Sequence, residues 1–373
     1  MISKQEILDV REPPGKAVGK VVELWRPVPG TNKIMCTACA RYCKIGEGQV
    51  GLCGVRGVHD GKLWLYVYGR VITGHVDPIE KKPVSHYRPG SKIFSIATTG
   101  CNWLCRYCQN ADISQRRKVE GIEVEPQDVV DMTLEQGCQG LAYTYNQPSI
   151  FIEFARDIGM KAREAGLINI FVSNGYDTPE TVAEMDKFLD CVTVDFKGSG
   201  ETNFVRKYIN IPNADPIFQT ILETRDKTKI HIEITDLIVP QVGDDLEAAR
   251  KLSRWVYDNL GPDCPIHFLR FHPDYKMMEF PWTPVETLEK HCAVAKEAGL
   301  KYVYIGNVPG HPLEHTYCPG CNAIAIKRYG FDITGWYLDK DNKCKKCGYQ
   351  LTILGKLEKT AKENRFYSVL YHR

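Results

Sequence analysis

The alternation of strands and helices between residues 92 and about 300 constrains the fold of this chain more than any other feature. Segments such as 178–189 and 244–261 carry apolar residues at helical spacing. Between the helices lie seven apolar segments rich in Val, Ile, Tyr and Phe, which predict buried strands: 92–100, 140–146, 169–175, 191–198, 230–239, 266–271 and 302–307. This alternation predicts an α/β fold with a parallel sheet, open or curled into a barrel.

Most of these strands end in polar residues. The first runs into TTGCNWLCRYC, the second into YTYNQPS, the third into SNG, the fourth into DFK, the sixth into FHPDY and the seventh into GN. Right-handed crossovers place the carboxyl ends of parallel strands at one edge of the sheet. One polar end is commonly a helix cap or a solvated turn, but six at one edge predict a shared site.

The 15 cysteines of the 373 residues are concentrated in three groups. The groups are Cys36, Cys39, Cys43 and Cys53; Cys101, Cys105 and Cys108; and Cys318, Cys321, Cys344 and Cys347. The other four, Cys138, Cys191, Cys264 and Cys292, are expected to be small buried hydrophobes. Because MISKQEILDVREPPGK is charged and lacks an apolar core, we expect no signal peptide, no membrane anchor and a cytoplasmic location. In that reducing compartment, clustered cysteines usually bind metal or carry out redox chemistry.

The C-x3-C-x2-C group of Cys101, Cys105 and Cys108 directly follows the first predicted strand. Three thiolates can bind three irons of a 4Fe–4S cluster and leave the fourth iron open to a substrate or cofactor. A zinc site completed by a distant His or Cys is the alternative, which the spacing alone leaves open.

This motif, with an aromatic residue before its last cysteine, resembles the radical S-adenosylmethionine (SAM) superfamily. The resemblance implies a partial open (β/α) barrel with a 4Fe–4S cluster at its mouth. It also implies that SAM binds the open iron and is cleaved by one electron to a 5′-deoxyadenosyl radical, which abstracts hydrogen from a substrate. In that family the aromatic residue lies against the adenine of SAM, and here it is Tyr107.

The same resemblance assigns further SAM contacts at the strand ends. YNQP stands where the family binds the methionyl ammonium, which makes Asn146 and Gln147 candidates; relatives have Glu at the second position, so Gln147 removes a negative charge. Other positions match the branch of the pyruvate formate-lyase activating enzyme. In that branch the positions of Ser173 and Asn174 contact the ribose or a cation. Asp195 and Lys197 match its Asp-x-Lys motif, in which the Lys meets the SAM carboxylate, and His272 stands where it places a His that contacts SAM.

A narrower resemblance covers nearly the whole chain. CTACARYCKIGEGQVGLCGVR, AYTYNQPSIF, FVSNG, VDFKG, FLRFHPDYKM and YVYIGNVPG are similar to AmmeMemoRadiSam-type radical SAM proteins. The resemblance implies Memo-type and AMMECR-type partner proteins, and it fixes no substrate.

The two outer cysteine groups predict further metal sites. Cys318-x2-Cys321-x22-Cys344-x2-Cys347 has zinc-ribbon spacing and predicts a closed structural zinc site, with rubredoxin-like iron as the lesser alternative. The C-x2-C-x3-C-x9-C group from Cys36 to Cys53 is less stereotyped. It is compatible with zinc, a second iron–sulfur cluster or no stable metal, and the sequence favours zinc slightly.

Together these features predict an N-terminal Cys-rich module (1–85), a radical SAM partial barrel (86–310) and a C-terminal zinc-ribbon-like module (311–373). We expect a radical SAM enzyme that acts on a protein or peptide and takes electrons from a donor such as flavodoxin or ferredoxin. The alternatives are an activase of a glycyl-radical enzyme and a non-catalytic metal-binding adaptor whose ribbon binds nucleic acid. The net charge of +2 argues against the adaptor.

Overall fold

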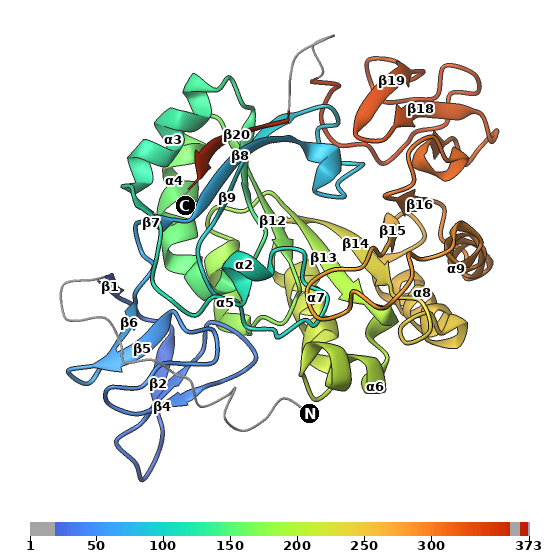
Figure 1. Ribbon diagram of the computed structural model, residues 1–373. Helices are drawn as coiled ribbons and strands as arrows, with labels where there is room; N and C mark the ends of the chain where they lie inside the picture. The colour runs from blue at the N-terminus through green and yellow to red at the C-terminus, as the bar shows by residue number, and fades with distance from the viewer. Residues whose placement is uncertain (1–18, 359–365, 372–373) are drawn as a thin grey trace.

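The structure is a computed structural model that describes residues 19–358 and 366–371. Its centre is a sheet with the strand order β16-β15-β14-β13-β12-β11-β9-β8-β20 (Figure 1). The seven strands from β9 to β16 in this sheet are parallel and confirm the predicted strands. They are β9 (Lys92–Ala97), β11 (Gly140–Tyr143), β12 (Ile168–Ser173), β13 (Cys191–Lys197), β14 (His231–Ile238), β15 (Ile266–Arg270) and β16 (Val303–Gly306).

Two antiparallel strands extend this sheet beyond the predicted parallel part. β8 (Thr73–Pro78) pairs with β9, and β20 (Tyr367–Tyr371) pairs with β8. β8 precedes the predicted boundary at residue 85, and β20 follows the one at residue 310, so the central sheet takes strands from both sides of these boundaries. The pairing of β20 joins segments nearly 300 residues apart along the chain, and no local sequence pattern indicates such a pairing.

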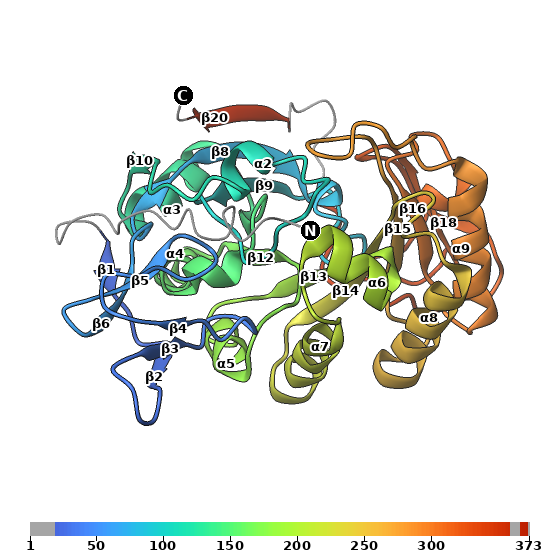
Figure 2. The same cartoon turned by 60° about the horizontal axis from the view of Figure 1, so that its bottom comes forward.

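Helices follow the parallel strands and cover the outside of the curved sheet (Figure 2). Neighbours in this layer pack on one another, α3 on α4, α4 on α5, α5 on α7 and α8 on α9. Local capping explains several starts: the Thr178 side chain accepts a hydrogen bond from the Thr181 amide at α5, with Pro179 in the first turn. The helices are α3 (Pro126–Glu135), α4 (Ile152–Glu164), α5 (Pro179–Met185), α7 (Asp215–Lys227), α8 (Leu246–Leu260) and α9 (Val285–Glu297).

Short elements fill the connections between these strands and helices. Near the carboxyl edge of the sheet they are α2 (Ala111–Ser114), η2 (Pro148–Phe151), η3 (Gly198–Gly200), α6 (Thr202–Phe204) and η4 (Val205–Ile209). Elsewhere they are η1 (Ile79–Lys81), η5 (Pro312–Glu314) and the pair β7 (Arg70–Val71) with β10 (Ile122–Glu123). In the part of the chain that is described, no helix combines the length and the apolar character needed to cross a bilayer.

The N-terminal residues form two small antiparallel sheets beside α4 and α5 (Figure 1). One contains β1 (Lys20–Val21), β6 (Lys62–Leu65) and β5 (Arg56–His59), and the other β2 (Trp25–Pro27), β3 (Ile34–Cys36) and β4 (Lys44–Ile45). The buried Arg56 side chain fastens this module to the barrel. It donates to the carbonyl oxygen of Ile150 at 2.7 Å and forms an ion pair with the buried Glu153 of α4.

The C-terminal module is a three-stranded sheet with a small core of its own. Its strands are β17 (Thr316–Tyr317), β18 (Ile324–Tyr329) and β19 (Asp332–Trp336). The core contains Cys318 and Cys344 and continues into Tyr302 and Tyr304 at β16. This module is therefore packed directly on the edge of the barrel.

We expect the Glu153→Ala variant to lower the free energy of unfolding by about 3–5 kcal/mol, because it leaves the Arg56 charge buried without its partner. Thermal unfolding and limited proteolysis of the N-terminal module would measure the effect. The matched control is Lys187→Ala, which removes an exposed ion pair to Glu184 and should change stability by about 0–1 kcal/mol. Equal effects of the two variants would contradict the anchoring role of the Arg56–Glu153 pair.

Candidate functional site

The loop that follows β9 carries the three cysteines of the C-x3-C-x2-C motif at the carboxyl edge of the sheet. Main-chain hydrogen bonds hold this loop from both sides. The Gly100 amide donates to the carbonyl oxygen of Ile113 at 3.0 Å, and the Leu104 amide donates to that of Ile209 in η4 at 3.0 Å. The Lys276 amide, from the segment after β15, donates to the carbonyl oxygen of Arg106 at 2.8 Å. Distant parts of the barrel thus fix the position of the cysteines.

The thiols of Cys101, Cys105 and Cys108 are partly exposed and form no disulfide. Desolvation nevertheless raises the pKa of Cys101 to about 11 and that of Cys105 well above the usual range, with the neighbouring Cys108 charge adding to both effects. In the metal-free protein the thiols therefore hold their protons near neutral pH. Iron must displace these protons, which makes cluster binding dependent on pH.

The electrostatic partners of these thiols include Lys197 at the end of β13. Desolvation is the main influence on the pKa of Cys105 and of Cys108 and raises both, while the positive charge of Lys197 acts in the opposite direction on each. The Lys197 ammonium also donates to a carboxylate oxygen of Asp195 at 2.6 Å. The structure thus places the Asp-x-Lys motif of β13 within electrostatic reach of the cysteine loop.

Two candidate residues present acceptors that have no partner. The Asn146 amide group donates to the carbonyl oxygens of Thr98 and Gly100, at 2.8 and 2.9 Å, and so orients the side chain beside the cysteine loop. Its carbonyl oxygen Oδ1 is buried and accepts no hydrogen bond from residues 19–358 or 366–371, and the same is true of Oδ1 of Asp195. Buried acceptors without donors are costly, so they indicate a ligand that donates hydrogen bonds. The amino and ribose hydroxyl groups of SAM are donors of this kind, and SAM therefore fits the residues present.

Three other candidates belong to a network inside the protein. The side-chain amide of Gln147 donates to Asp177 at 2.9 Å and to Ser173 at 2.8 Å. Its oxygen accepts from the main-chain N–H of Asn174 at 2.7 Å. Ser173 also donates to the Asp177 carboxylate at 3.0 Å. Both ends of the Gln147 side chain are therefore used within the fold, which leaves its main chain for any contact with SAM.

Asp177 was not among the residues selected from the sequence. It is buried, and desolvation raises its pKa, while hydrogen bonds from Ser149, Ser173 and Gln147 lower it. Its position directly after SNGY was the available signal, but nothing in the sequence shows that it meets Gln147. This pairing gives the amide at position 147 a physical reason: an amide can donate to a buried carboxylate, whereas an ionised Glu would repel it.

Tyr107 and His272 lie in different surroundings. The Tyr107 ring is buried, stacks on Phe204 with centroids 5.9 Å apart and meets the edge of Phe271 at 6.2 Å. His272 is partly exposed, and its ring lies 5.3 Å from that of Trp282. The contacts of these two residues with SAM remain predictions.

The four cysteines of the C-terminal module converge on one point. All four sulfurs lie within 4.8 Å of one another, with Cys318 and Cys347 at 3.5 Å and Cys321 and Cys344 at 3.8 Å. Zinc–sulfur bonds of about 2.3 Å in a tetrahedron place the sulfurs about 3.8 Å apart. The geometry therefore fits a single tetrahedral ion.

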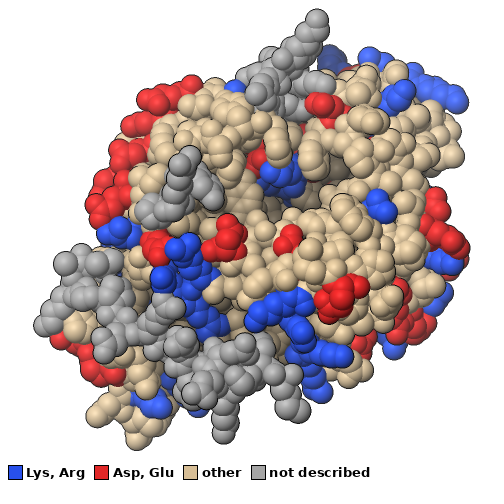
Figure 3. Space-filling model, viewed as in Figure 1, with Lys and Arg blue, Asp and Glu red and all other residues tan. Residues whose placement is uncertain are grey.

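The charges on the face drawn in Figure 3 are mixed. Asp and Glu gather mainly along the left and right margins, a group of Lys and Arg lies in the lower middle, and uncharged residues occupy much of the centre. The side chains drawn in this view form no broad basic surface of the kind that binds nucleic acid.

The comparisons with known proteins agree with this site. The model of the radical SAM superfamily matches residues 95–256, from β9 into α8. An uncharacterized protein of Methanocaldococcus jannaschii is 40% identical over 326 residues, which cover 87% of this chain and 96% of that protein. The chain therefore belongs to the radical SAM superfamily.

The solved structures that resemble this chain have low sequence identity to it and low TM-scores. A domain of a pyruvate-formate lyase-activating enzyme from Bacteroides vulgatus is 18% identical, with a TM-score of 0.39; the match covers 45% of this chain and 99% of that domain. A radical SAM methyltransferase from Sphaerobacter thermophilus is 12% identical, with a TM-score of 0.45 and coverage of 59% and 67%.

We expect Gln147→Glu to lower the free energy of unfolding by about 1–3 kcal/mol at pH 7, because it adds a carboxylate beside the buried Asp177. Two such groups raise the pKa of the pair, so the loss should shrink at pH 5, where one of them takes up a proton. Thermal unfolding at both pH values would measure the effect. The double variant Gln147→Glu/Asp177→Asn keeps one carboxylate and one amide and should recover stability; a single variant as stable as wild type at pH 7 would refute this explanation.

For the C-terminal site, we expect the full-length Cys321→Ser variant to lose one equivalent of zinc while retaining its iron. Metal ligation supports folding of the small module, so proteolysis within residues 311–358 should increase. Elemental analysis and mass spectrometry of the fragments would measure both effects, with Cys138→Ser as a control at a buried cysteine outside the three groups. Unchanged zinc content in the Cys321→Ser variant would rule out this site.

Proposed function

We propose that this protein is a radical SAM enzyme whose active site is the carboxyl edge of the sheet around Cys101, Cys105 and Cys108. The observation that carries the proposal is the proximity of this loop to Lys197 and to two buried oxygens, Oδ1 of Asn146 and of Asp195, that accept no hydrogen bond from the described residues. A cluster with three thiolate ligands supplies an open iron and one electron, by which bound SAM is cleaved to a 5′-deoxyadenosyl radical.

Four residues of the chain each bind a different part of SAM. The Lys197 ammonium pairs with the SAM carboxylate, since it already lies close to the thiols that hold the cluster. The free carbonyl oxygen of Asn146 accepts from the amino group, and Asp195 Oδ1 accepts from a ribose hydroxyl. Tyr107 packs against the adenine. The protein thus contributes placement and exclusion of water, while the cofactors carry the difficult chemistry.

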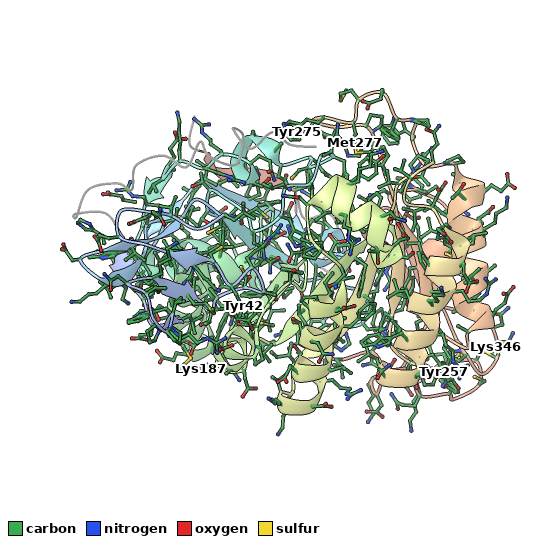
Figure 4. The ribbon with its side chains drawn as sticks, turned by 90° about the horizontal axis from the view of Figure 1, so that it is seen from below. Tyr42, Lys187, Tyr257, Tyr275, Met277 and Lys346 are labelled. Carbon is green, nitrogen blue, oxygen red and sulfur yellow. The ribbon has the colours of Figure 1, made fainter. Side chains whose placement is uncertain are left out.

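We further propose that the substrate is a protein or peptide. The segment after β15 presents three large apolar side chains to solvent: Tyr275, Met278 and Trp282 are 41%, 66% and 53% exposed. The Lys276 amide of this segment donates to the carbonyl oxygen of Arg106, which brings the segment next to the cysteine loop. Figure 4 shows Tyr275 at this end of the molecule, away from Lys187, beside Met277, which is buried in the core. Grouped exposed apolar side chains commonly mark a surface that binds a partner.

The remaining assignments extend this proposal. The C-terminal cysteines hold structural zinc, the protein acts in the cytoplasm with flavodoxin or ferredoxin as electron donor, and Memo-type and AMMECR-type proteins are its partners. The sulfur spacing supports the zinc assignment, and the resemblance of the sequence motifs supports the partners.

We expect the Cys105→Ser variant, reconstituted with iron and sulfide without oxygen, to lose SAM cleavage, because two thiolates cannot hold the cluster with an open iron. Chromatography of 5′-deoxyadenosine in the presence of SAM and a reductant measures the reaction. The control is Cys138→Ser, a buried cysteine outside the three groups. Cleavage by the Cys105→Ser variant at the wild-type rate would overturn the proposed function.

The class of substrate can be tested by isotope transfer. We expect deuterium to enter 5′-deoxyadenosine from a deuterated protein or peptide fraction, and Trp282→Ala to reduce this transfer at least about tenfold, a loss of about 1.4 kcal/mol. Mass spectrometry of the product measures the label, and Leu134→Ala is an exposed apolar control on α3. Label that arrives from a free metabolite at the rate of SAM cleavage would exclude a macromolecular substrate.

A further inference from the structure

A cavity in the N-terminal module is lined by all four cysteines of the first group, together with Arg41 and Asn102. The four cysteines are free and do not form disulfides with one another. Desolvation is the main cause of the raised pKa of Cys39, and the charges of Cys43, Cys36 and Cys53 add to it, so these three thiols lie near that of Cys39.

Local structure brings these cysteines together from separate turns. Cys36 ends β3, and its amide donates to the carbonyl oxygen of Cys43 at 3.0 Å. A turn in which the Gly54 amide donates to the carbonyl oxygen of Gly51 at 2.9 Å presents Cys53 from the other side. Glycine suits this turn, because Gly54 has a φ of +79°.

The spacing of the sulfurs distinguishes this group from the C-terminal one. Four sulfurs of the C-terminal module lie within 4.8 Å of one another, whereas among the described residues no three sulfurs of the N-terminal group do so. The three cysteines of the barrel loop are also spread more widely than that. One zinc ion needs converging sulfurs, but an iron–sulfur cluster binds each thiolate through a different iron and needs them farther apart.

We propose that Cys36, Cys39, Cys43 and Cys53 hold a second 4Fe–4S cluster. Its four thiolates complete the ligation of all four irons, so this cluster has no open position for a substrate. The sequence alone slightly favoured zinc for this group, and the arrangement of the sulfurs around a shared cavity favours the cluster.

The charges around the cavity suit an anionic occupant. Arg41 and Arg56 both line it, and Nη2 of Arg41 is buried without a hydrogen-bond partner in the part of the chain that the structure describes. Main-chain groups of Ala38, Arg41 and Leu52 hydrogen-bond to the sulfurs of Cys36, Cys39 and Cys43. Such hydrogen bonds to sulfur stabilise the negative charge of a thiolate-bound cluster and tune its reduction potential.

The second cluster would lie directly beside the barrel loop. The carbonyl oxygen of Cys53 lies so close to Gly100 that a Cβ at Gly100 would approach it to 2.4 Å. Cys53 also interacts electrostatically with Cys101, and Asn102, the next residue, lines the cavity. Arg41 Nε donates to the carbonyl oxygen of Asn102 at 2.8 Å, which joins the module to the loop.

This position, together with the closed ligation, assigns the second cluster a role in electron transfer. One electron from a low-potential reductant such as reduced flavodoxin would pass to the second cluster and then to the first, and no bond in the protein is formed or broken. This role rests on the proposed function, whereas the presence of the second cluster does not.

The test compares full-length proteins that are reconstituted and desalted without oxygen. One variant is Cys101→Ala/Cys105→Ala/Cys108→Ala, and the other is Cys39→Ala/Cys53→Ala. We expect each to contain about half the iron and sulfide of wild type, close to four of each per chain. Each dithionite-reduced variant should show the electron paramagnetic resonance signal of one cluster. The wild-type signal should be broader than their sum, because neighbouring clusters interact magnetically.

The outcomes distinguish a failure of the second-cluster proposal from a failure of the proposed function. A triple variant that binds no cluster, or binds an extra zinc in its place, overturns the second cluster. Wild-type iron content in the Cys39→Ala/Cys53→Ala variant does the same. Wild-type iron content in the triple variant contradicts the proposed function and supports the second cluster. Should the double variant fail to fold, the resonance spectrum of the triple variant decides alone, because iron that binds adventitiously does not give the signal of a reduced 4Fe–4S cluster.

Discussion

Parallel hydrogen bonding between β9, β11, β12 and β13 is the constraint on which the site depends. The register pairs Tyr143 with Ile96 and with Phe171, and Ser173 with Val194, so the ends of four strands lie at one edge. Residues separated by about 90 positions in the chain thereby meet. Asn146 fixes this meeting point, because its amide binds the two carbonyl oxygens that precede the first cysteine of the loop.

The N-terminal module is part of this site and not an appendage to it. Arg56 joins the module to α4, Arg41 joins it to the cysteine loop, and Cys53 packs against Gly100. A buried ion pair contributes little net stability by itself, but breaking it is costly, so it fixes one arrangement of two parts. Such fixation is what electron transfer between two neighbouring metal centres requires.

The sequence was sufficient for the features that depend on local pattern. All seven parallel strands and the helices at 179–185 and 246–260 follow from apolar periodicity and capping residues. The antiparallel strands β8 and β20 were missed because their pairing depends on distant partners. The pairing of Gln147 with Asp177 was missed for the same reason: each is an ordinary polar residue until the fold places them 2.9 Å apart.

The three cysteine groups differ in how the fold arranges their sulfurs, which spacing in the sequence does not reveal. Each group has a CxxC pair, so the sequence motif by itself permits zinc or iron in all of them. In the C-terminal module, hairpin-like turns bring four sulfurs within 4.8 Å, where only one ion fits between them. In each of the other two groups the sulfurs are spread more widely than that, which is compatible with a polynuclear cluster. Because these two groups meet at Cys53 and Gly100, a change in the occupant of one alters the electrostatic environment of the other.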